Sequence, residues 1–169
     1  MLSIDVSNLK VLIIEDNLHF RIFLKSLLQA LGIVDVREAR DGQEAIDILA
    51  DFPADLATLD QKMAGVSGLE FVAMVRDETS SPAPFLPIIM MTGNTDAELL
   101  KLARDAGVND FVTKPVSATS FLARIQSVLE DPRLFVRSDQ YFGPDRRLCH
   151  SSFKGDENRI EQTNFIPPS

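Results

Sequence analysis

The chain has 169 residues, of which 45% are hydrophobic and 25% are charged, a balance typical of a folded globular protein. This length fits one domain of ordinary size with some additional sequence. The single cysteine, Cys149, excludes an internal disulfide framework and a cysteine-rich zinc site. Because the sequence has neither a long apolar stretch nor the pattern of a secretory signal, we expect a cytoplasmic protein that does not bind membranes.

Acidic charge is concentrated in the first part of the chain. Residues 1–131 contain 11 Lys/Arg against 20 Asp/Glu, whereas residues 132–169 contain 6 against 5. Nucleic acids are bound chiefly through cationic side chains that displace counterions from the phosphates. We therefore expect residues 1–131 not to bind nucleic acid.

Short apolar runs alternate with helical patterns over the first 131 residues. Lys10–Ile14 is typical of a buried strand, and residues 18–31 place leucine and phenylalanine at helical spacing, with Gly32 as the cap. Further strands are predicted at 34–39, 55–59, 88–91 and 110–113, and further helices at 42–50, 69–75, 96–106 and 118–130, the last with Ser117 as its N-cap.

Five strand–helix units in strict alternation predict an α/β fold with helices on both faces of a parallel sheet. A doubly wound sheet of this size fits the strand order 2-1-3-4-5. The composition changes after residue 131, because residues 132–169 hold five of the twelve aromatic residues and show no long period. We expect this segment to be a C-terminal tail on the 1–131 domain, since it is too short for a core of its own.

Polar residues stand at the carboxyl ends of four predicted strands. They are Glu15 and Asp16, then Asp60, Thr92 and Lys114. Ligands of an open parallel sheet bind at this edge. Three carboxylates brought together there would repel one another unless a cation lay among them, and Mg²⁺ prefers such oxygen ligands. Lys114 adds a positive charge for an anionic oxygen.

Each of these residues also has an ordinary structural explanation. The acidic pair could be a solvated helix start, which the helix dipole favours. Asp60 could be the N-cap of the next helix, and Thr92 is at home in a strand. Their joint occurrence at four strand ends nevertheless favours a functional site.

Four segments give the chain a recognisable pattern: KVLIIEDN, TLDQKMAGVSGLE, MMTGN and GVNDFVTKPVS. Together they resemble the receiver domain of two-component response regulators, over about residues 9–130. The resemblance implies a flavodoxin-like sheet and a bacterial signalling protein. It further implies that Asp60 accepts a phosphoryl group, while Glu15, Asp16, Asp60 and the backbone carbonyl of Lys62 hold Mg²⁺.

The same resemblance assigns roles to residues around the phosphoryl group. Thr92 and Lys114 would contact its oxygens, and Phe111 would be the aromatic residue that changes position when Thr92 moves. Lys62 and Asn94 lie two residues beyond Asp60 and Thr92, from where their side chains could set the lifetime of the phosphate.

Three features of the motifs concern the loops. The family commonly has proline where this chain has Ala64, so we expect a less rigid loop after Asp60. Gly93 stands where alanine is frequent, which could loosen its own loop. The family usually has a cis peptide bond before the proline that corresponds to Pro115.

The resemblance implies a phosphoacceptor that regulates a partner rather than a metabolic enzyme. A phosphatase with an aspartyl nucleophile would need an acid at position 62, where this chain has lysine. Expected partners are a histidine kinase or histidine phosphotransfer protein and a downstream protein target that reads the surface of residues 96–130. The alternatives are a transcriptional or RNA-binding regulator that uses the tail and a receiver-like scaffold that works without phosphate.

The tail and the oligomeric state leave interpretations open. We favour an arm whose Phe135, Tyr141 and Phe142 cover apolar surface on the same or a second copy, over a docking motif around Arg146 and Arg147. A homodimer through charged residues is one interpretation, and ordinary solvated surface is the other. The charged residues in question are Lys101, Arg104, Asp105, Asp110 and Arg124.

Overall fold

The computed structural model describes residues 6–130, 132–146 and 164–166, the last three by their backbone only. Its first strands and helices are β1 (Lys10–Ile14), α1 (Leu18–Ala30), β2 (Asp35–Ala39), α2 (Gly42–Asp51), β3 (Leu56–Asp60) and α3 (Gly68–Arg76). The next are β4 (Ile88–Thr92), α4 (Ala97–Ala106), β5 (Asp110–Thr113) and α5 (Ala118–Glu130). Each predicted element is present, with ends that differ by a residue or so.

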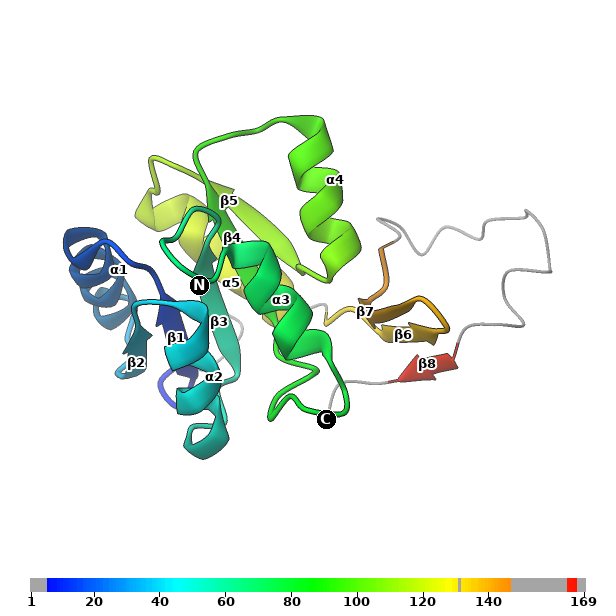
Figure 1. Ribbon diagram of the computed structural model, residues 1–169. Coiled ribbons are helices and arrows are strands. Elements are labelled where there is room, and N and C mark those ends of the chain that lie inside the picture. The colour runs from blue at the N-terminus through cyan, green and yellow to red at the C-terminus, as the bar shows by residue number, and fades with distance from the viewer. Residues whose placement is uncertain (1–5, 131, 147–163, 167–169) are drawn as a thin grey trace.

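The first five strands form a parallel sheet in the order β2-β1-β3-β4-β5, as predicted. Helices cover both of its faces (Figure 1). Crossovers to parallel strands pass over one face or the other of the sheet, so the chain must supply apolar side chains on both. β3 and β4 accordingly have every residue buried.

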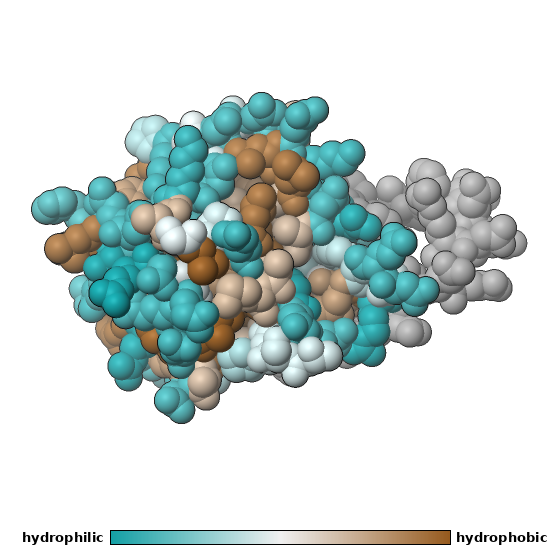
Figure 2. Space-filling view, in the orientation of Figure 1, coloured by the Kyte–Doolittle hydropathy of each residue, from teal (hydrophilic) through white to brown (hydrophobic). Residues whose placement is uncertain are grey.

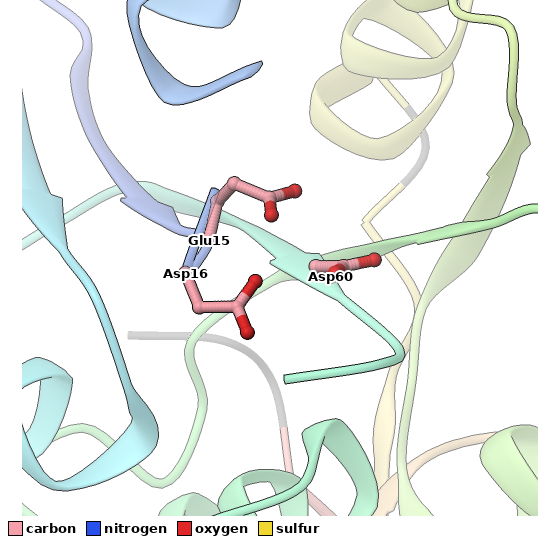
Figure 3. Close-up of side chains that lie close together, drawn as sticks. All are labelled: Glu15, Asp16 and Asp60. Carbon is pink, nitrogen blue, oxygen red and sulfur yellow. The ribbon is translucent and has the colours of Figure 1, made fainter. Parts of the chain in front are cut away.

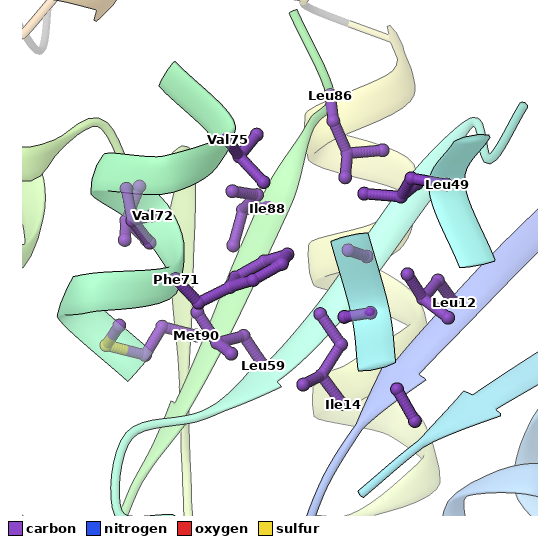
Figure 4. Packing of buried hydrophobic residues seen from close by; sticks show 14 of the residues in the cluster. Leu12, Ile14, Leu49, Leu59, Phe71, Val72, Val75, Leu86, Ile88 and Met90 are labelled. Carbon is purple, nitrogen blue, oxygen red and sulfur yellow. The ribbon is translucent and has the colours of Figure 1, made fainter. Parts of the chain in front are cut away.

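One face of the sheet is covered by α2, α3 and α4. Phe71 of α3 is fully buried, and its ring lies among aliphatic side chains of α2 and the central strands, including Leu49, Leu12 and Leu59 (Figure 4). The opposite face packs against α1 and α5, through residues such as Leu28 and Phe121.

Side-chain caps fix the ends of several helices. Ser67 and Glu70 form a capping box at the start of α3, and Asn17 caps α1. The Ser117 hydroxyl accepts from the Ser120 amide at 3.1 Å, which confirms the predicted N-cap of α5. Gly107 ends α4 with a φ of +114°, a conformation that few residues other than glycine adopt.

The tail contains β-structure that its sequence did not predict. β6 (Phe135–Ser138) pairs antiparallel with β7 (Tyr141–Pro144) and with β8 (Asn164–Ile166), giving a three-stranded sheet in the order β7-β6-β8. The strands have only three or four residues each, too few for a visible alternation of apolar and polar residues. These short strands are consistent with the absence of a long period in the sequence of residues 132–169.

The β6–β7 hairpin packs against the first domain through aromatic rings. Phe135 is 1% exposed, and its ring centroid lies 5.0 Å from that of Phe85, in the segment before β4. Phe142 completes the cluster, with centroids 5.4 Å from Phe85 and 5.5 Å from Phe135. The hairpin thus covers apolar surface of its own chain.

A buried arginine lies beneath this aromatic cluster. Arg76, the last residue of α3, is 5% exposed, and its guanidinium carbon lies 5.0 Å from the centre of the Phe135 ring. It donates hydrogen bonds to the carbonyl oxygens of Gly107 and Pro84 and to Oδ1 of Asn109. Burial away from water lowers the pKa of Arg76 to about 9.

Ion pairs join the β6–β7 region to α4 and to the turn after α3, and some pairs involve charged residues proposed for a dimer surface. Arg146 pairs with Asp105 of α4 at 3.1 Å, and Arg137 pairs with Glu78. Asp110 of β5 pairs with Arg124 of α5 at 3.3 Å. These charges therefore have partners within the chain, and each exposed pair contributes little to stability.

Polar residues cover much of the face that carries α2, α3 and α4, with hydrophobic residues in small groups between them (Figure 2). Within the described residues, no helix has the length and apolar character needed to cross a membrane. The interpretations that concern Arg147 and Cys149 fall outside the described residues.

We predict that Phe135→Ala lowers the free energy of unfolding by about 3 kcal/mol, because it leaves a cavity between Phe85, Phe142 and Arg76. The neighbouring Leu134→Ala is the control, since Leu134 is 38% exposed. Urea unfolding of the full chain measures both. Equal effects of the two substitutions would contradict a packed hairpin.

Candidate functional site

Three carboxylates meet at the carboxyl edge of the sheet because β1 and β3 are adjacent parallel strands. Ile14 of β1 is in register with Leu59 of β3, so the residues that follow each of them reach the same edge. Glu15 and Asp16 come directly after β1, and Asp60 ends β3. Figure 3 shows their side chains directed toward a shared space.

This acidic cluster is compact and partly buried. One carboxylate oxygen from each of Glu15, Asp16 and Asp60 lies within 4.8 Å of the others. Glu15 is 1% exposed and Asp60 5% exposed, whereas Asp16 lies at the surface. Three hard oxygen donors with an open side toward solvent suit Mg²⁺, which retains several of its waters. The donor set thus fits the predicted cation.

Lys114 supplies the positive charge next to the cluster. Its Nζ lies 3.0 Å from Oδ1 of Asp60 and 3.4 Å from Oε2 of Glu15. Lys114 follows β5 and is joined to Pro115 by a cis peptide bond, as the resemblance implied. The ring of Phe20, on α1, lies beneath the ammonium group at 4.3 Å. A cation above an aromatic face is attracted to it, so Phe20 helps to hold Lys114 in place.

The ionisation of Glu15 reflects both its burial and its neighbours. Removal from water is the largest cause of its raised pKa, and the Asp60 charge raises it further. The Asn17 amide, which donates to Oε1 of Glu15 at 3.0 Å, and Lys114 act in the opposite direction. A cation bound among the carboxylates would also favour the ionised form.

The loop between β3 and α3 is fastened to the cluster. The backbone amide of Ala64 donates to Oδ2 of Asp16 at 2.9 Å. A proline at this position, which the family commonly has, could not make this bond because it has no amide hydrogen. Ala64 therefore attaches this loop to Asp16, whereas the sequence alone led us to expect only a less rigid loop.

Thr92 ends β4 at the same edge and is 1% exposed. Its hydroxyl lies 2.6 Å from Oε1 of Gln61 and 2.9 Å from the Asn94 carbonyl oxygen, and it accepts from the Asn94 amide at 3.0 Å. The neighbouring Gly93 has open space where a Cβ would stand, so its lack of a side chain is no steric requirement.

The remaining predicted residues lie around this centre. Phe111 of β5 is half-buried and packs against the α2–α3–α4 side of the core. The Lys62 and Asn94 residues are exposed. Gln61 and Phe20 also contact the site residues, although neither was predicted to belong to the site. The available signals in the sequence were that Gln61 directly follows Asp60 and that Phe20 lies in the first turn of α1.

The fold and this edge together define a class of protein: a doubly wound α/β domain with an acidic cluster and a lysine at the carboxyl ends of its parallel strands. The sequence matches the family model of the response regulator receiver domain over residues 11–126. The chain belongs to this family, whose members are regulatory phosphoacceptors of two-component signalling.

Individual relatives agree with this assignment. The chain is 30% identical to chemotaxis protein CheY-3 of Vibrio cholerae over 123 residues, which cover 73% of this chain and 93% of that protein. It is 31% identical to chemotaxis protein CheY of Pseudomonas aeruginosa over 122 residues, or 72% and 97% of the two chains. The structure of Vibrio cholerae CheY4 aligns with a TM-score of 0.66 at 30% identity, covering 71% of this chain and 98% of that one.

We predict that Lys114→Met lowers the free energy of unfolding at pH 7 without added divalent cation by about 1–2 kcal/mol, because the carboxylates lose their positive neighbour. The difference from wild type should shrink as the pH falls through the raised pKa of Glu15, since a protonated carboxyl no longer needs the ammonium.

Lys62→Met is the matched control, because Lys62 is exposed near the same edge. It should change stability little at either pH. A loss for Lys114→Met that is the same at pH 7 and pH 4 would contradict a charge effect. Urea unfolding at the two pH values makes the comparison.

Proposed function

We propose that this protein is a phosphoaccepting switch of a two-component or phosphorelay pathway, in which Asp60 receives a phosphoryl group from a histidine kinase or a histidine phosphotransfer protein. The observation that carries the proposal is the position of Asp60: its carboxylate lies 3.0 Å from the Lys114 ammonium and beside Glu15 and Asp16. Membership of the receiver family supports the same chemistry.

The reaction requires a nucleophile and compensation of negative charge. An oxygen of Asp60 forms a bond to phosphorus while the bond between phosphorus and the donor's imidazole nitrogen breaks, and the imidazole leaves. The product is an acyl phosphate on Asp60. The Lys114 ammonium, already beside Oδ1 of Asp60, is placed to neutralise charge on a phosphoryl oxygen. Such catalysis consists mostly of positioning and electrostatics.

Glu15, Asp16 and Asp60 would hold Mg²⁺ at this edge, with the Lys62 backbone carbonyl as a further ligand. When bound, the ion would neutralise charge on the phosphoryl oxygens. The chain's own residues fix the ligands beforehand. The Asn17 amide bonds to the Glu15 carboxylate, and the Ala64 amide bonds to the Asp16 carboxylate.

The output of the switch involves β4, β5 and the helices that follow them. A phosphoryl group on Asp60 would attract the Thr92 hydroxyl, which lies at the end of the next strand. Movement of Thr92 would leave space toward which Phe111 can turn, changing the surface of α4, β5 and α5 that a protein partner reads. Lys62 and Asn94, exposed near the site, would set the lifetime of the phosphate.

We predict that incubation with acetyl phosphate and Mg²⁺ adds the mass of one phosphoryl group to the wild-type chain and none to Asp60→Asn. Asp51→Asn, at an exposed aspartate of α2, is the control and should be modified like the wild type. Intact-protein mass spectrometry measures the adduct. Omission of Mg²⁺ should abolish it, if the acidic cluster serves as the ion site.

Rapid hydrolysis could remove the adduct before measurement, so a second probe is needed. Beryllofluoride is a stable analogue of the phosphoryl group, and its binding should shift the NMR signals of residues around Asp60, Thr92 and Lys114. Absence of both an adduct and beryllofluoride binding in the folded wild-type protein would refute the proposed function.

A further inference from the structure

The side chain of Gln61 ties the loop after β3 to the end of β4. Its Oε1 accepts a hydrogen bond from the Thr92 hydroxyl at 2.6 Å, and its backbone amide donates to the Met91 carbonyl at 3.0 Å. Gln61 directly follows Asp60, and Thr92 is 1% exposed. A residue beside the phosphoacceptor thus holds the hydroxyl that the proposed switch must move.

The hydroxyl of Thr92 has a single hydrogen to donate. Two acceptors lie within its reach, Oε1 of Gln61 at 2.6 Å and the carbonyl of Asn94 at 2.9 Å, while the Asn94 amide donates to its oxygen at 3.0 Å. To donate to a phosphoryl oxygen on Asp60, Thr92 must withdraw that hydrogen from its present acceptors. The structure therefore represents a state in which the hydroxyl is engaged elsewhere.

We propose that Gln61 is a positioning residue that restrains Thr92 before phosphorylation and so sets the equilibrium between the resting and active conformations. This inference rests on the proposed function. A bond made only in the resting state stabilises that state relative to the active one, which lowers the population of the active conformation. The apparent affinity for a phosphoryl group or its analogue falls in the same proportion.

The identity of residue 61 matters more to this restraint than that of residue 94. Asn94 contacts Thr92 through its backbone amide and carbonyl, which every substitution except proline leaves in place. The Asn94 side chain instead accepts from the Asp96 amide. Gln61 uses its side-chain oxygen, so a substitution there removes the restraint while the backbone contact with Met91 remains.

The test is a titration of the 169-residue chain with beryllofluoride in the presence of Mg²⁺, followed by NMR. Gln61→Leu keeps nearly the same side-chain volume but has no acceptor, and we expect it to bind about three- to tenfold more tightly than the wild type. Gln43→Leu makes the same substitution on α2, where Gln43 is exposed, and should leave the affinity unchanged.

A second pair of variants separates a restraint on Thr92 from a general loosening of the loop. In a Thr92→Val background there is no hydroxyl to release, so adding Gln61→Leu should not change the affinity. In the absence of beryllofluoride, the Phe111 ring signals of Gln61→Leu should move part of the way toward their positions in the wild-type complex. Both results together would support the restraint.

The proposal would be overturned if the wild type binds and Gln61→Leu binds equally or more weakly. It would also be overturned if the gain in affinity persisted in the Thr92→Val background, because the effect would then not pass through the hydroxyl. A folded wild type that neither forms the acetyl phosphate adduct nor binds beryllofluoride would refute the proposed function itself, so the two failures are distinguishable.

Discussion

The ion pairs of Lys114 with Asp60 and Glu15 are the interaction on which the edge of the sheet depends. A parallel sheet places the residues after β1 and β3 side by side, and here those residues are acids. Burial of Glu15 beside Asp60 is costly, and the raised pKa of Glu15 records that cost. Lys114 offsets part of it from the end of β5, and the Phe20 ring supports the ammonium from α1. Lys114 therefore links side chains from the ends of β1 and β3 to the first turn of α1.

Much of this could be predicted from the sequence, because the apolar strands and the rules of parallel sheets determine which residues share an edge. The contacts between Thr92 and Gln61 and between Lys114 and Phe20 could not be predicted, because they depend on side-chain rotamers and on the rotation of α1. The hairpin escaped prediction for another reason. Its strands are too short to show a periodic pattern. They are stabilised by packing of Phe135 against Phe85, which is distant in the sequence.

α3 and α4 connect two regions that are far apart along the chain. Each helix begins near the acidic edge, since α3 follows the loop after Asp60 and α4 follows Thr92. Each ends at the hairpin: α3 at Arg76 and α4 at Gly107, whose carbonyl Arg76 binds (Figure 1). A side chain at position 107 would meet that of Arg76 at 3.0 Å. The C-terminal ends of both helices are thus fixed together. A displacement of α3 or α4 that starts at the acidic edge is therefore resisted at the opposite ends of the helices, by this packed and hydrogen-bonded junction.

This junction also joins residues inside the span that matches the family model to residues beyond it. Phe85 and Arg76 lie inside the matched span of residues 11–126, whereas their partner Phe135 lies beyond it. The chemotaxis relatives are already covered over 93% and 97% of their lengths, which leaves little in them to correspond to the hairpin. Arg76 and Phe85 are therefore constrained in this chain from outside the matched span, because a substitution at either position that the receiver core tolerates would still remove a packing partner of the hairpin.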